Sequence, residues 1–178
     1  MRSIFWLLLL GVVLVTVALV VRSGMMARKN PGVPINAAMR VAQAENQHPW
    51  SDRDLDLIAK NYPGTQDGES GLRYIIRRPG TGDARPKRGQ LITVNYEGRF
   101  LLDEIIFDTS KGREGPFNFR LGEGMVIAGW DLGLADMKAG ERRTLIVPHW
   151  LGYGDKGIRG RIPSRSTLVF DIELLSFD

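Results

Sequence analysis

Residues 168–174, which read LVFDIEL, decide the fold of this chain. Apolar side chains fall at every second position from Leu168 to Leu174, and Asp171 and Glu173 lie between the later ones. Because side chains alternate between the two faces of a strand, this pattern predicts an antiparallel strand with one buried face.

Four other short runs of β-branched and aromatic residues predict further strands. Gly and Pro residues separate them and favour turns. In the second run, Ile92, Val94 and Tyr96 would share one face of the sheet. The four runs are 72–77, 91–96, 117–120 and 144–147.

One helical pattern interrupts these strands, at residues 128–137. Trp130, Leu134 and Met137 fall on one stripe of such a helix, and Gly140 follows as a helix-ending residue. Many strands and one amphipathic helix predict an α+β domain in which an antiparallel sheet curls around that helix.

Residues 4–21 form a long apolar run without a charged side chain. As a helix this run would span about 27 Å, close to the thickness of the bilayer hydrocarbon core. It is longer than the core of a secretory signal, and no small-x-small cleavage site follows it. We therefore expect a transmembrane signal-anchor over residues 1–22. A cleaved, secreted form is the alternative.

The charges that flank this run are nearly balanced, with Arg2 before it and Arg22, Arg28 and Lys29 after it. A short head followed at once by an apolar run nevertheless resembles a signal-anchor that exports the C-terminal part of the chain. We expect a membrane-anchored protein in a bacterial inner membrane, in contact with it through residues 4–21, with an extracytoplasmic (periplasmic) catalytic domain.

Residues 23–69 are predicted to form a linker that contains a short helix, before a domain over residues 70–178. Ser51 precedes two acidic residues, which favours a helix start, and Pro63 ends the pattern. This helix is either a docking or dimerisation helix or a small helix packed on the domain, and we prefer the second interpretation.

The sequence excludes several kinds of chemistry. It contains no cysteine, so disulfides and thiol catalysis are absent. His48 and His149 lack partners at metal-ligand spacing, and no nucleophile elbow, dinucleotide fingerprint or phosphate loop occurs. Asp103, Glu104 and Asp108 only weakly resemble a glycosidase pair. We therefore expect no metal and no cofactor. Basic residues are dispersed along the chain, so we also expect no nucleic-acid partner.

Aromatic residues form the remaining candidate site. Core packing is the better explanation of any one of them, but together they exceed the needs of a small sheet–helix core and favour an apolar ligand site. They are Tyr96, Phe107, Phe117, Phe119, Trp130, Tyr153 and Phe170.

From residue 71 to residue 178 the sequence resembles the FKBP-type peptidyl-prolyl cis–trans isomerases, immunophilins that bind macrolides. The resemblance covers about 60 % of the chain. It rests on runs that occur in family order: PKRGQ (86–90), VNYEG (94–98), FDTS (107–110), PFNF (116–119), VIAGW (126–130), YG (153–154), IP (162–163) and LVFDIEL (168–174).

The resemblance implies a five- or six-stranded antiparallel sheet wrapped around one short helix, with a substrate pocket between them. Trp130 would form the pocket floor beneath the prolyl ring and act with Tyr96, Asp108 and Tyr153 in catalysis. The residues implied to bind substrate are Phe107, Arg113, Phe117, Phe119, Val126, Ile127, Ile162 and Phe170.

The implied activity is rotation about X–Pro bonds in proline-containing polypeptide clients, by non-covalent binding and without a cofactor. Macrolide inhibitors are implied as further ligands. The alternative is a non-catalytic FKBP-like chaperone or scaffold module. Arg161 stands where relatives are often more apolar, and we expect it to affect substrate preference or macrolide affinity.

Overall fold

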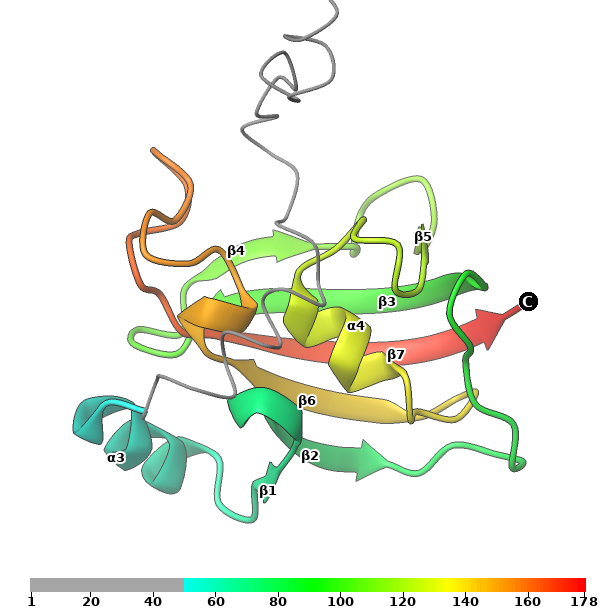
Figure 1. Cartoon of the computed structure of the whole chain (residues 1–178), viewed down its shortest axis with the longest axis horizontal. Coiled ribbons are helices and arrows are strands. Elements are labelled where there is room, and N and C mark those ends of the chain that lie inside the picture. Colours follow the sequence, from blue (N-terminus) through cyan, green and yellow to red (C-terminus); the bar gives the residue numbers. More distant parts are fainter. Residues whose placement is uncertain (1–49) are drawn as a thin grey trace, which may run out of the picture. The chain divides into compact units, whose positions relative to one another are not determined.

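A computed structural model describes residues 50–178 of the chain (Figure 1). It contains two α-helices, α3 (Asp52–Asn61) and α4 (Ala128–Leu134), and two 3-10 turns, η1 (Glu69–Gly71) and η2 (His149–Leu151). The strands are β1 (Gln66–Asp67), β2 (Arg73–Arg78), β3 (Leu91–Phe100), β4 (Ile106–Thr109), β5 (Phe117–Arg120), β6 (Arg142–Val147) and β7 (Leu168–Phe177).

The strands form one antiparallel sheet in the order β1-β2-β6-β7-β3-β4, and β5 pairs with β3 beside this path. The antiparallel α+β architecture is therefore confirmed, but the expected number of five or six strands is wrong, because the sheet has seven. Two strands lacked a readable signal. β1 has only two polar residues, and β4 is a four-residue strand inside a loop-like stretch.

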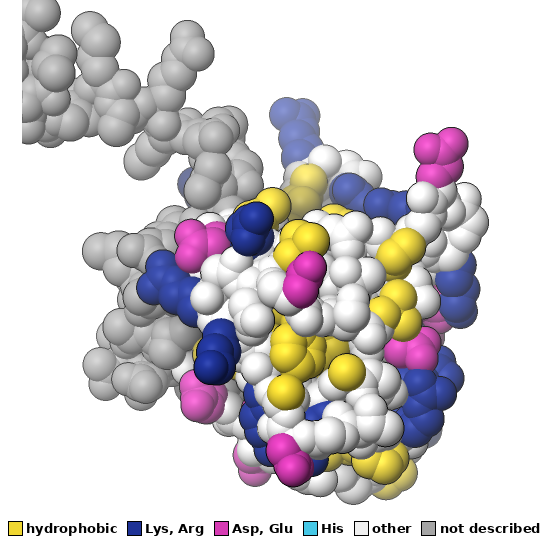
Figure 2. Space-filling model, turned by 90° about the vertical axis from the view of Figure 1, so that its right-hand side faces the viewer, with side chains coloured by type: hydrophobic (Ala, Val, Ile, Leu, Met, Phe, Trp, Pro, Cys, Tyr) yellow, Lys and Arg dark blue, Asp and Glu magenta, His cyan; other side chains and the backbone are white. Residues whose placement is uncertain are grey.

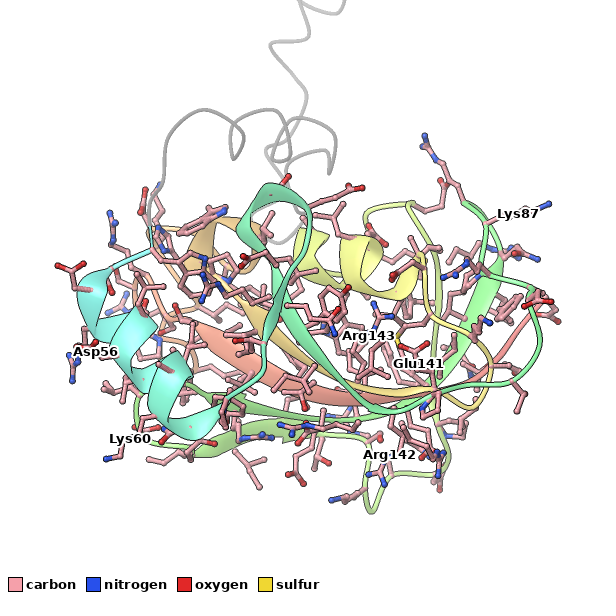
Figure 3. The ribbon with its side chains drawn as sticks, turned by 90° about the horizontal axis from the view of Figure 1, so that it is seen from below. Asp56, Lys60, Lys87, Glu141, Arg142 and Arg143 are labelled. Atoms are coloured by element: carbon pink, nitrogen blue, oxygen red, sulfur yellow. The ribbon has the colours of Figure 1, made fainter. Side chains whose placement is uncertain are left out.

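The sheet is covered by two helices, since α3, the short helix predicted within the linker, and α4 pack on opposite faces of the sheet. Side chains alternate along β6, so Leu145 and Val147 join the core under α4 while Ile146 joins a second core under α3. Both helices are visible in Figure 1, and Figure 3 shows α4 lying above the sheet.

The core under α4 contains the predicted strand and helix faces. Ile92, Val94 and Tyr96 of β3 are buried there, as expected. Two glycines let α4 approach β6 closely: a Cβ atom at Gly133 would lie 2.5 Å from the Leu145 side chain, and one at Gly129 would lie 2.5 Å from Val147.

Helix α4 ends at Leu134, three residues earlier than the pattern predicts. The Arg143 guanidinium donates to the Gly133 carbonyl at 3.0 Å, so this carbonyl has a partner from outside the helix. The Met137 N–H instead bonds to the Leu134 carbonyl at 3.2 Å. Met137 stays fully buried, which explains why it fits the apolar stripe without being helical.

Helix α3 begins as predicted, with the Ser51 side chain accepting the Asp54 N–H at 3.1 Å. Ile58 and Tyr62 pack against Ile146 and Val169 of the sheet. Val169 is therefore fully buried, and the first part of β7 is buried on both faces rather than on one.

No helix within residues 50–178 is long and apolar enough to cross a bilayer. The predicted anchor over residues 1–22 and the first part of the predicted linker lie outside the described residues.

Candidate active site

Trp130, on α4, is the centre of an aromatic cluster on the α4 side of the sheet. It is 4 % exposed. Its ring centroid lies 5.0 Å from that of Tyr96, 5.4 Å from Phe170, 5.8 Å from Phe119 and 6.0 Å from Phe117. Tyr96, Phe117 and Phe170 present their rings nearly at right angles to the indole, a favoured aromatic geometry.

A glycine on β3 leaves room for two aromatic rings of the site, Phe170 and Phe107. Gly98 of β3 pairs with Phe170 of β7, and a Cβ atom at Gly98 would lie 2.7 Å from the Phe170 ring and 3.0 Å from that of Phe107. The centroids of these two rings are 5.7 Å apart. The absence of a side chain at this position thus leaves room for both rings.

Asp108, on β4, lies at the edge of this cluster and is held by several donors. Its carboxylate accepts the Tyr96 hydroxyl at 2.9 Å and the Thr109 N–H at 3.1 Å. Arg113 donates to the same carboxylate, and an Arg161 nitrogen lies 3.3 Å from it. The carboxylate is therefore an acceptor that fixes its neighbours.

The two tyrosines of the site are neutral at physiological pH. Burial, followed by the hydrogen bond to Asp108, raises the pKa of Tyr96 to about 12. Burial also raises the pKa of Tyr153, although the nearby charge of Arg161 opposes this shift. Both hydroxyls therefore remain hydrogen-bond donors.

The structure brings the residues that the resemblance singled out into one place. The aromatic and aliphatic ones all belong to a single hydrophobic cluster, and Asp108 and Arg113 are joined to it through the hydrogen bonds above. The members of the cluster are Tyr96, Phe107, Phe117, Phe119, Val126, Ile127, Trp130, Tyr153, Ile162 and Phe170. Their individual roles stay predictions.

A model of the FKBP-type peptidyl-prolyl cis-trans isomerase family matches residues 82–175, which is more than half of the chain and includes this cluster. The chain belongs to this family. The prediction of an FKBP-type peptidyl-prolyl cis–trans isomerase is thereby confirmed, and the protein is an enzyme that isomerises X–Pro bonds.

Similar proteins occur in several eukaryotes. The FKBP chain is 44 % identical over 108 residues to the peptidyl-prolyl cis-trans isomerase Fkbp12 of Drosophila melanogaster, which covers 61 % of this chain and 99 % of the relative. It is 45 % identical over 124 residues to FK506-binding protein 2 of Podospora anserina (70 % and 66 %). FK506-binding protein 1 of Dictyostelium discoideum is 44 % identical over 107 residues (60 % and 98 %).

Two residues of the FKBP site were not singled out from the sequence. The Ser110 hydroxyl accepts the Tyr96 N–H at 2.9 Å, and the Thr109 hydroxyl donates to the Tyr96 carbonyl at 3.1 Å. Both anchor the backbone of Tyr96 to β4. Their position directly after Asp108 in the FDTS run was the available signal, because hydroxyl residues often bond to nearby backbone groups.

Proposed function

We propose that this FKBP domain isomerises X–Pro bonds at the aromatic cluster around Trp130, by non-covalent binding of the prolyl ring. The observation that carries the proposal is the set of rings around Trp130 beside one fixed carboxylate, Asp108. The known activity needs an apolar environment for a twisted amide, and these residues supply it.

The physical basis is differential stabilisation. Amide resonance gives the planar bond a rotation barrier of about 18–20 kcal/mol. In the twisted transition state the nitrogen loses conjugation and the carbonyl loses dipolar character. Aromatic surroundings therefore solvate the twisted form better, relative to water, than the planar form. Each tenfold acceleration requires about 1.4 kcal/mol of such preference.

Hydrogen-bond donors without internal partners support the same location. Within residues 50–178, neither the Ile127 N–H nor the Tyr153 hydroxyl makes a hydrogen bond, and the buried Trp130 indole N–H has no acceptor either. An unpaired buried donor costs about 1–3 kcal/mol. We assign Ile127 and Tyr153 to the client carbonyl groups next to the proline, where they would hold the bent peptide.

Asp108 has a positioning part in this mechanism. It holds the Tyr96 ring through the hydroxyl contact, and the guanidinium groups of Arg113 and Arg161 lie against its two oxygens. No proton needs to move, because bond rotation breaks no covalent σ bond.

The site is tested by comparing Tyr153→Phe with Tyr74→Phe in the full chain. Tyr74 is a partly buried tyrosine on β2 that packs against the same core but is not among the predicted site residues. Isomerisation of a Leu–Pro peptide is measured by NMR exchange. We expect kcat/KM to fall about three- to tenfold in Tyr153→Phe, the value of one neutral hydrogen bond, and to stay at the wild-type value in Tyr74→Phe.

The opposite result would remove the role assigned to Tyr153. If Tyr153→Phe keeps full activity, or if both variants lose it equally, the hydroxyl of Tyr153 has no specific part in catalysis. Circular dichroism of each variant separates such a loss from misfolding.

Ligands of the site follow from the relatives, two of which are named FK506-binding proteins. We propose that FK506-type macrolides and proline-containing polypeptides compete for the Trp130 cluster in this chain. Titration of the macrolide should inhibit the peptide reaction and change tryptophan fluorescence at the same concentration. Inhibition without competition against peptide would contradict a shared site.

We also propose that residues 1–22 anchor the enzyme in a bacterial inner membrane with the FKBP domain on the periplasmic side, where its clients would be exported proteins. The support is the uncharged run over residues 4–21. A phosphatase reporter fused after residue 178 should be active on the extracytoplasmic side. Activity confined to the cytoplasm would reject this orientation. If the measured mass of the mature protein shows that the N-terminal residues are missing, the cleaved, secreted form is established instead.

A further inference from the structure

The loop between Tyr153 and β7 carries a tight turn with two arginines at its tip. Ile158 and Ile162 exchange two backbone hydrogen bonds, both 2.8 Å long, and Gly160 between them has a positive φ of 76°. Ile162 is 3 % exposed and anchors the turn in the core. Arg159 and Arg161 are therefore presented from a fixed backbone.

Arg161 reaches the edge of the aromatic cluster at Asp108, here called the mouth of the site. Its guanidinium lies 3.3 Å from the Asp108 carboxylate, which Arg113 contacts on the other oxygen. Two guanidinium groups thus share one carboxylate. Arg159 at the same tip is exposed and makes no ion pair within residues 50–178. The mouth therefore carries an excess of positive charge.

The distribution of charged side chains is different on another side of the domain. Figure 2 shows the side of the molecule that faces right in Figure 1, away from this turn, and there basic and acidic side chains are interspersed around hydrophobic ones. The side shown in Figure 2 thus lacks the one-signed cluster found beside Asp108.

Arg161 can leave Asp108 for a carboxylate of the substrate at little cost to the stability of the site. Its contact with Asp108 is long, and its side chain is 54 % exposed, so the pair is worth about 0–1 kcal/mol. If Arg161 turns away, Asp108 keeps the Tyr96 hydroxyl and Arg113. A guanidinium offers five donors in a planar fork that matches a carboxylate.

We propose that Arg161, with Arg113 on the same Asp108 carboxylate and Arg159 two residues away on the turn, forms a cationic subsite for the carboxylate of an Asp or Glu residue directly before the client proline. The inference rests on the proposed function, because the subsite can act only on a proline bound at the Trp130 cluster. It assigns the enzyme a substrate class, namely acidic X–Pro segments.

The test compares Glu–Pro and Gln–Pro peptides, which have the same shape and differ by one charge. With the full wild-type chain at low salt, kcat/KM for Glu–Pro should exceed that for Gln–Pro about two- to fivefold, as expected for an exposed charge pair. The ratio should fall towards one in about 1 M salt, where charges are screened within about 3 Å. A Leu–Pro peptide serves as the reference.

Three variants locate the effect. Arg161→Gln should bring the Glu–Pro to Gln–Pro ratio close to one, while Arg161→Lys should retain part of the preference. Arg165→Gln is the matched control, because Arg165 lies in the same loop but pairs with Asp155 at 3.2 Å. It removes the same charge and should leave the ratio at the wild-type value.

The outcomes separate the two proposals. If Leu–Pro and Gln–Pro peptides are isomerised but Glu–Pro is not preferred, or if Arg165→Gln lowers the ratio as much as Arg161→Gln, the subsite is refuted and the proposed function stands. If no peptide is accelerated above buffer, the proposed function fails and the subsite fails with it.

Discussion

At the scale of single residues, one carboxylate organises the mouth of the site. Asp108 joins β3 through Tyr96, the loop after β4 through Arg113, and the loop before β7 through Arg161. Its side chain is 23 % exposed, so its hydrogen bond with the Tyr96 hydroxyl operates partly out of water, whereas its pair with the exposed Arg161 is weak. Three segments of the chain therefore meet at one acidic side chain.

Tyr96 gives this arrangement a pH dependence in the alkaline range. Its pKa is 10.0 in the unfolded chain and about 12 in the fold, so the fold favours the neutral hydroxyl. The resulting stabilisation is complete below pH 10 and is lost as the pH rises towards 12. We expect the free energy of unfolding to fall by about 2 kcal/mol over this range on account of Tyr96.

Urea unfolding at pH 9 and at pH 11.5 measures this decline. Tyr62, whose pKa is also raised to about 12 by burial and by Glu104, contributes a second loss of the same sign. Tyr96→Phe should therefore retain part of the alkaline decline rather than all of it. An unchanged decline in Tyr96→Phe would show that its hydroxyl ionises normally in the fold.

The sequence allowed the aromatic part of the site to be predicted, and the resemblance placed Arg113 beside Asp108, but the contact of Arg161 with Asp108 was not predicted. Alternation along a strand places Tyr96 and Phe170 on the core side, and the sequence runs shared with the family contain the other site residues. The contact between Arg161 and Asp108 depends on how a Gly-containing turn folds back over the site. Neither residue carries a local signal for the other.

At the scale of elements, a buried arginine ties α4 to the sheet. Arg143 is 3 % exposed; it donates to the Glu141 carboxylate at 2.8 Å and to the Gly133 carbonyl at 3.0 Å. Its guanidinium also lies 4.6 Å from the centroid of the Tyr74 ring. In Figure 3, Arg143 and Glu141 lie between the sheet and α4, and Arg142 points to the other side.

Loss of this arginine should be costly because Glu141 is itself 4 % exposed. We expect Arg143→Met to lower the free energy of unfolding by about 3–5 kcal/mol, as for other buried pairs that lose one partner. Arg142→Met is the matched control on the exposed neighbour and should change stability by less than about 0.5 kcal/mol. Urea denaturation of both variants measures the difference.

A double variant distinguishes charge burial from packing. Replacing both residues, Arg143→Met with Glu141→Leu, should recover part of the loss, because no buried carboxylate is then left without its partner. Asp136, the second carboxylate that Arg143 binds, is 55 % exposed and stays solvated. If the double variant is no more stable than Arg143→Met, α4 depends instead on the contacts to Gly133 and Tyr74. The predicted helix end at residue 137 was wrong because the Arg143 guanidinium, and not the Met137 N–H, bonds to the Gly133 carbonyl.

At the scale of the whole described unit, the sheet has a core on each face. Ile58 of α3 is 1 % exposed and packs with Val169 and Ile146, on the side away from Trp130. Tyr62 reinforces this contact by donating to Glu104 at 2.8 Å, while Arg99 bonds to both Glu104 and Asp171. Helix α3 is therefore packed on the domain, as preferred from the sequence.

Truncation of Ile58 tests whether α3 unfolds together with the sheet. We expect Ile58→Ala to lower the free energy of unfolding by about 2–5 kcal/mol, the usual cost of deleting a large buried side chain. Lys60→Ala, at an exposed position of the same helix, should be nearly neutral. A normal stability of Ile58→Ala would mean that α3 detaches before the sheet unfolds.

The overall topology was only partly predictable. Antiparallel pairing and the central place of the helix follow from alternation and composition. The strand count did not, because β1 has two residues and gains its place only by pairing with β2. The second core was hidden as well, since an isolated Val169 among alternating residues does not reveal that a helix covers it.

The position of β7 has a consequence for how the protein is made. This strand comes after all the others along the chain, yet it lies between β6 and β3 and pairs with both. Until the ribosome has released residues 168–177, the nascent polypeptide holds two separate half-sheets with open edges, which are prone to mispairing. A premature stop before this strand would therefore yield a product for proteolysis rather than a shortened enzyme.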